Sequence, residues 1–99
     1  MRLVFSEAAK ADLIRIGDRI ALESPMRAIT FIDEIEAKCR RIPDFPLSCP
    51  LLPRRKSSGI RRMVHGNYLI FYRVDADAVI VVHVLHGAMN YEAILFPEF

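Results

Sequence analysis

Residues 59–90 constrain the fold of this chain more than any other stretch, because they predict three consecutive strands. Apolar runs rich in Val, Ile, Tyr and Phe are interrupted only at Gly66-Asn67 and at residues 75–77, and such breaks are typical of tight turns between strands. The Gly66-Asn67 pair suits a two-residue hairpin, although the usual order is Asn then Gly. The expected strands are residues 60–65, 68–74 and 78–85.

The last of these strands is apolar on both faces, which predicts that it is covered from both sides. Strict alternation places one set of side chains on one face, namely Val79, Val81 and Leu85, and a second set on the other, namely Ile80, Val82 and Val84. Two helices can cover only one side of a sheet. The other side must be covered by the Pro-rich segment, by residues 91–99 or by another protein, because a large exposed apolar patch usually marks a partner surface.

Two amphipathic helices are expected before the sheet, after a short first strand at residues 2–5. The first, capped by Ser6, runs from Glu7 to about Leu22. Its buried stripe is Ala9, Leu13, Ile16 and Ile20, flanked by Ile14 and Ala21, and its solvent face is Lys10, Asp12, Arg15, Asp18 and Arg19. The second runs from Pro25 to about Ile42, after Ser24, and its stripe is Ala28, Phe31, Ile32, Ile35, Cys39 and Ile42. The short link between them predicts an antiparallel hairpin.

The stretch between residues 43 and 58 contains four prolines and the basic run 54–56. Proline removes a backbone donor and fixes φ, so this composition disfavours helices and central strands. We expect a long ordered loop, held in place by Leu47, Leu51 and Leu52.

Length and composition limit the possible classes of protein. The chain has 99 residues, 53% hydrophobic and 26% charged, which indicates one globular domain spanning residues 1–99. A net charge of +2 and a pI near 8.7 are too mild to predict nucleic-acid binding. We find no signal peptide or membrane span in the sequence and expect a cytoplasmic protein in which Cys39 and Cys49 are reduced.

No set of residues predicts catalysis. His83 and His86 are three apart on a strand, so we expect them on opposite faces, and His65 adds no ligand cluster. His83 is expected to be a hydrogen-bonded core or rim residue, whereas His86 at a strand end is a candidate for function. No activated nucleophile, phosphate loop or acidic pair is evident. We therefore expect no catalytic residues, no cofactor and no metal.

Basic and aromatic side chains supply candidates for partner contact. Arg61 and Arg62 are expected on opposite faces of their strand, where each is either a solvated rim residue or a partner of an anionic group. Tyrosines on strands are either core residues or stacking platforms. The candidate residues for partner binding are Arg61, Arg62, Tyr68, Tyr72, Arg73, His86, Met89, Asn90 and Tyr91.

The order of elements and four motifs resemble a known family. The motifs are residues 3–13 (LVFSEAAKADL), 59–62 (GIRR), 66–74 (GNYLIFYRV) and 84–90 (VLHGAMN). Together they resemble the ParE branch of the RelE/ParE superfamily of type II toxins. The resemblance implies an α+β fold, in which an N-terminal short strand and an antiparallel helical hairpin pack on one face of a mostly antiparallel three- to four-stranded sheet.

The resemblance also implies a function. ParE-like toxins are non-catalytic poisons of DNA gyrase, are held inactive by a ParD-like antitoxin with a ribbon-helix-helix domain, and are not expected to bind nucleic acid sequence-specifically. RelE-like members instead cut messenger RNA in the ribosome. At two positions where RelE-like members have an arginine, this chain has Leu69 and Met89. Apolar side chains cannot stabilise a phosphoryl anion. Asn90 stands where ParE members often have aspartate. The alternatives are a RelE-type ribonuclease and a degenerate, non-toxic module that binds antitoxin.

Overall fold

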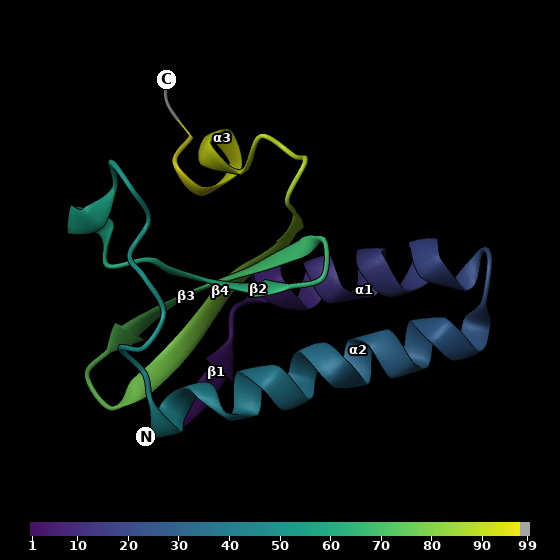
Figure 1. The fold of residues 1–99 in the computed structure, drawn as a ribbon, viewed down its shortest axis with the longest axis horizontal. Helices are drawn as coiled ribbons and strands as arrows, with labels where there is room; N and C mark the ends of the chain where they lie inside the picture. Colours follow the sequence, from purple (N-terminus) through teal and green to yellow (C-terminus); the bar gives the residue numbers. More distant parts are fainter. Residues whose placement is uncertain (98–99) are drawn as a thin grey trace.

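The computed structural model describes residues 1–97; the last two residues of the expected covering segment 91–99 therefore lie outside the described part (Figure 1). In chain order the elements are β1 (Arg2–Phe5), α1 (Glu7–Ala21), α2 (Pro25–Arg40), the 3-10 turns η1 (Ile42–Asp44) and η2 (Lys56–Ser58), β2 (Arg61–His65), β3 (Tyr68–Asp75), β4 (Ala78–His86) and α3 (Tyr91–Leu95). The predicted α+β class is confirmed. The sheet has the order β1-β4-β3-β2, with β1 parallel to β4 and the other neighbours antiparallel.

The helical hairpin forms as its caps predict. The Ser6 and Ser24 side chains accept hydrogen bonds from the backbone N–H of Ala9 and Arg27, which satisfies free donors at the two helix starts. Pro25 begins α2, where its missing N–H removes no helical bond. The two helices cover one face of the sheet and extend beyond it on the right of Figure 1. The buried stripe of α2 is confirmed, from Ala28 to Cys39 with Ile42 just beyond it.

A β-bulge in β4 changes which side chains share a face. Phe71 pairs with His83 and Tyr72 with Val81, so Val82 is an extra residue on β4. The bulge shifts the alternation, and Val84 joins Val79 and Val81 in the core beneath the helices. Leu85 and Val82 pack on the opposite side. The expected grouping of Leu85 with Val79, and of Val84 with Val82, is therefore wrong.

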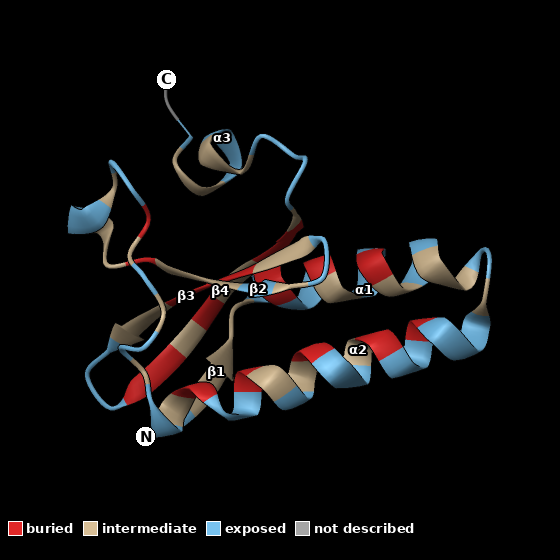
Figure 2. Ribbon diagram, viewed as in Figure 1, coloured by how far each residue is buried: buried red, intermediate tan, exposed pale blue. Residues whose placement is uncertain are grey.

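The chain itself covers much of the second face of the sheet. Leu52 of the Pro-rich loop is buried against Phe71 and Leu85, and side chains of the C-terminal segment pack on the same cluster, namely Tyr91, Leu95 and Phe96. Figure 2 shows α3 above the sheet, away from the helical hairpin. Helix α3 was not predicted, and neither were the two 3-10 turns. Of the three leucines expected to hold the loop, Leu52 is buried and Leu51 forms a bridge to Arg61, as predicted. The expectation for Leu47 is wrong, because its side chain is 64% exposed.

Asp12 is the buried charged side chain of the described core, at 2% exposure. Its Oδ2 accepts the backbone N–H of Val84 at 2.9 Å and lies 2.7 Å from Nδ1 of His83, while Oδ1 pairs with Arg15. Strand β1 pairs with β4 only as far as Val81, so Asp12 satisfies the edge of β4 beyond that point. The expectation that Asp12 faces solvent is wrong, since it lies three residues after Ala9 and four before Ile16, on the buried stripe.

We predict that Asp12→Ala lowers the free energy of unfolding by about 2–4 kcal/mol, because it leaves the buried Val84 N–H without an acceptor and removes the buried carboxylate that pairs with Arg15 and His83. Asp18→Ala is the matched control on the solvent face of α1 and should change it by less than about 0.5 kcal/mol. Urea unfolding monitored by circular dichroism measures both. Equal effects of the two substitutions would contradict the role of Asp12.

Candidate partner-binding site

The structure does not gather the nine candidate residues into one site. Some lie at the end of β4 beside α1, some lie on the face covered by α3, and others hold the Pro-rich loop. The groups are Tyr68, His86 and Met89; Arg62, Asn90 and Tyr91; Arg61 and Tyr72; and Arg73 alone.

The first group lies where β4 ends. The rings of Tyr68 and His86 meet edge to face, with centroids 5.1 Å apart. Gly87 follows, and its N–H donates to the carbonyl of Asn67 at 2.8 Å, which fixes the loop against the β2–β3 hairpin. A side chain at Gly87 would place Cβ 3.3 Å from that carbonyl oxygen. Met89 is 42% exposed in this loop. The position of these residues on a strand end and its following loop suits partner contact.

The second group attaches α3 to the sheet. Arg62 donates to Oη of Tyr91 at 3.2 Å, and the Tyr91 ring lies 5.2 Å from that of Phe71. Asn90 caps α3 by accepting the N–H of Ala93. The amide of Asn90 therefore does the capping work that an aspartate would also do. Arg62 shares the face of Phe71, so the expectation that Arg61 and Arg62 point to opposite faces is confirmed.

Arg61 and Tyr72 are structural in the free chain. Arg61 donates to the carbonyls of Leu47 and Cys49 at 3.2 and 2.7 Å. Tyr72 has no exposed surface and donates to the carbonyl of Pro46 at 2.9 Å. Burial raises the pKa of the Tyr72 hydroxyl, which stays a donor. In the free chain Tyr72 therefore has no surface available to a partner, and its bond to the Pro46 carbonyl was not expected from the sequence.

Arg73 lies near the other end of β3 from Tyr68 and is 3.8 Å from Asp75. It is thus remote from the residues at the end of β4. Its side chain is 43% exposed, so the ion pair with Asp75 is weak.

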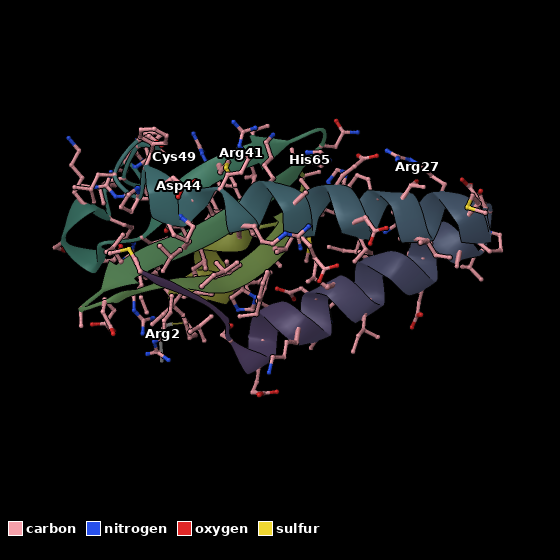
Figure 3. The ribbon with its side chains drawn as sticks, turned by 90° about the horizontal axis from the view of Figure 1, so that it is seen from below. Arg2, Arg27, Arg41, Asp44, Cys49 and His65 are labelled. Atoms are coloured by element: carbon pink, nitrogen blue, oxygen red, sulfur yellow. The ribbon has the colours of Figure 1, made fainter. Side chains whose placement is uncertain are left out.

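Glu34 and Cys39 are titratable groups whose pKa is shifted by their surroundings. Glu34 accepts from Arg27 and lies 3.0 Å from Nε2 of His65, and Figure 3 shows Arg27 and His65 along α2. The hydrogen bond from Arg27, followed by that from His65, lowers the pKa of Glu34. Burial raises the pKa of the Cys39 thiol to about 12, and both cysteines are free. Among residues 1–97 no cluster of three or more His, Cys, Asp or Glu side chains could hold a metal ion.

Two features of the surface were missed from the sequence. Arg15 and Arg19 of α1 line the same cleft as Tyr68 and His86. The four-residue spacing of the two arginines shows in the sequence that they share one face of the helix. The sequence does not show that this face lies beside the end of β4. Apolar side chains are also exposed on the helical hairpin, namely Ile14, Leu22, Met26 and Ile29. Within the described residues, no helix is long and apolar enough to cross a membrane.

The architecture is that of small α+β toxins, in which a helical hairpin packs on a four-stranded sheet. By structure the chain is similar to the chromosomal ParDE system from P. aeruginosa, with a TM-score of 0.75, 19% identity, and coverage of 87% of this chain and 95% of that one. It is also similar to the toxin–antitoxin complex RelBE2 from Mycobacterium tuberculosis, with a TM-score of 0.56 and 23% identity over 89% of this chain and 92% of that one. The RelB-RelE complex from Methanococcus jannaschii gives the same TM-score and identity over 95% and 99%. No match was found among curated proteins.

The sequence comparison identifies the family. Residues 3–91 match the model of the ParE toxin of the type II toxin-antitoxin system parDE. The chain therefore belongs to the ParE toxin family. Its resemblance to the ParE branch, given above on four motifs, is confirmed.

We predict that Tyr91→Ala detaches α3 from the sheet, because it removes both the ring contact with Phe71 and the acceptor of Arg62. Amide hydrogen exchange of residues 91–95 should accelerate at least tenfold, while exchange in α2 stays unchanged. Ile94→Ala is the matched control, since Ile94 lies on the same helix and is 37% exposed. Unchanged exchange in Tyr91→Ala would show that the tether does not hold α3.

Proposed function

We propose that this chain is a toxin that inhibits DNA gyrase without catalysis of its own and is neutralised in the cytoplasm by a ParD-like antitoxin of the ribbon-helix-helix type. The observation that carries this proposal is the family match over residues 3–91.

The alternative chemistry, cleavage of messenger RNA, lacks support at two positions. Leu69 packs against the apolar cluster beneath α3, and Met89 is a thioether in an exposed loop. Neither can stabilise the charge that develops on a phosphoryl group. The arginines nearest to these roles in the sequence are otherwise engaged, since Arg61 holds the loop and Arg62 binds Tyr91.

We place the gyrase contact on the loop at residues 87–90. This loop is exposed and fixed at its base by the bond from Gly87 to Asn67. The fixed base limits the backbone entropy that the loop loses on binding. The exposed Met89 side chain offers a partner apolar surface to bury.

Purified toxin should inhibit supercoiling and accumulate cleaved plasmid when added to gyrase at stoichiometric amounts. Met89→Ala should raise the concentration needed for half inhibition about tenfold, as expected for an anchor worth about 1.4 kcal/mol. Ile94→Ala, another exposed apolar truncation, should stay within about twofold. Normal gyrase turnover at stoichiometric toxin would overturn the proposal.

Induction of the toxin in cells tests the alternatives. Cuts in translated messenger RNA on induction would assign the chain to the ribonuclease branch. Growth without arrest on induction would assign it to a non-toxic binding module.

The antitoxin contact is better placed on the helical hairpin than on the sheet face, because α3 and the loop already cover that face. A groove of about 490 Å³ between α1 and α2 is lined mainly by small and apolar residues, namely Gly17, Asp18, Ala21, Pro25, Ala28, Ile29, Ile32 and Asp33. An amphipathic helix with apolar anchors suits such a groove. Asp18 and Asp33 at its sides favour lysine or arginine beside those anchors.

We predict that Ile29→Glu weakens the complex with the cognate antitoxin at least tenfold, because it places a charge in the apolar groove. Ile94→Glu on α3 is the matched control and should bind within about twofold. Calorimetric titration of the purified proteins measures both, and co-expression should show that only Ile29→Glu escapes neutralisation. Equal binding by the two variants would move the contact away from the hairpin.

A further inference from the structure

A small cleft between α1 and the end of β4 combines positive charge with an apolar wall. It has a volume of about 150 Å³ and is lined by Arg15, Ile16, Arg19, Tyr68, Val84, Leu85, His86 and Met89. No carboxylate is among these residues. The gyrase contact proposed above uses the loop, whose Met89 also borders this cleft, and the antitoxin contact uses the groove between α1 and α2. Neither contact explains the two arginines of the cleft.

Two guanidinium groups stand on one side of the cleft. Arg15 and Arg19 are four residues apart, so they lie one above the other on α1. Arg15 is held by the buried carboxylate of Asp12, which occupies part of its five-donor fork and leaves the other N–H groups available. In the described part of the chain the Arg19 side chain has no hydrogen-bond or ion-pair partner. One arginine is therefore positioned and the other is uncommitted.

A third donor comes from His86. The backbone N–H of Ala88 donates to Nδ1 of His86 at 3.0 Å, so Nδ1 carries a lone pair and the neutral ring carries its proton on Nε2. The edge-to-face contact with Tyr68 also restrains the ring. His86 thus presents an N–H donor without needing to be charged.

The nearby acids offset part of the charge of the cleft, and the remaining positive charge is that of Arg19. The buried Asp12 carboxylate offsets the charge of Arg15, with which it pairs, and it also accepts from His83 and from the Val84 N–H. Glu23 lines a neighbouring depression of about 350 Å³ together with Arg19 and Tyr68. The apolar wall of Ile16, Val84 and Leu85 lowers the local dielectric constant, which strengthens the attraction of an anion.

We propose that this cleft binds the phosphate group of a phosphate ester, with Arg15, Arg19 and His86 as donors. A tetrahedral phosphate offers oxygens to several donors at once, whereas a carboxylate offers two. The volume accommodates one phosphate group, and the surface continues past Arg19 and Tyr68 into the neighbouring depression. That continuity favours a phosphodiester of single-stranded nucleic acid, whose next nucleotide would occupy the second depression. The contact is to the backbone and carries no sequence preference.

The first test titrates the full-length protein with inorganic phosphate at constant ionic strength and follows backbone amides by NMR. The Ala88 amide, which reports on His86, should shift and saturate. Arg19→Gln should weaken the fitted affinity about tenfold. The matched control is Arg40→Gln, which removes the same charge from an exposed position on α2 and should stay within about twofold. Equal losses in both variants would mean diffuse attraction only and would overturn the proposal.

The second test uses fluorescence anisotropy with a labelled single-stranded oligonucleotide of mixed sequence. Binding should weaken with salt, and Arg19→Gln should reduce the slope of log K against log salt by about 0.7, while Arg40→Gln leaves it unchanged. Phosphate binding without oligonucleotide binding would support the cleft and assign it to small phosphate esters. Saturable binding of a polyglutamate peptide in place of phosphate would overturn the assignment of ligand class.

Discussion

The carboxylate of Asp12 is the interaction on which the arrangement of the layers depends. Strand β1 is short and parallel to β4, and beyond Val81 the edge of β4 has no strand beside it. Ser6 donates to the Val82 carbonyl at 2.8 Å and Asp12 accepts the Val84 N–H, so the start of α1 replaces the missing strand. A buried polar group without a partner would cost about 1–3 kcal/mol. These bonds therefore fix α1 over the sheet, and with it the hairpin and Arg15.

The bulge at Val82 decides which side chains of β4 face the helical hairpin and which face the Pro-rich loop and α3. Before the bulge the inward side chains of β4 are Val79 and Val81, and after it Val84 takes the same side. Leu85 is turned to the opposite face, where Leu52 and α3 pack on it. This second cover closes the surface on which Leu69 and Phe71 lie. What remains open is the loop after β4, the cleft beside α1 and the outer groove of the helical hairpin, so the proposed contacts are spread around the molecule.

One residue serves both stability and the proposed cleft. Arg15 pairs with the buried Asp12 carboxylate and lines the cleft with Arg19 and His86. The pairing with Asp12 restricts the Arg15 side chain in the free protein, so less side-chain entropy is lost when Arg15 binds a ligand. The basic loop forms a separate region: Arg55 pairs with Glu92 at 3.1 Å and lies over the Phe96 ring. That pair helps to hold the loop and α3 together over the second face.

The sequence by itself determined the class, the helical hairpin, the three consecutive strands and the family, because caps, turn residues and periodicity act over a few neighbouring residues. Gly66 has φ of +59° and Asn67 has no positive φ, so the hairpin follows from a glycine at its first turn position. Only the tertiary structure decided that Asp12 is buried, that the Tyr72 hydroxyl bonds to the Pro46 carbonyl and that Arg15 and Arg19 line one cleft with His86. Each of these depends on a contact between residues far apart in the chain, and the burial of a side chain is set by what packs over it.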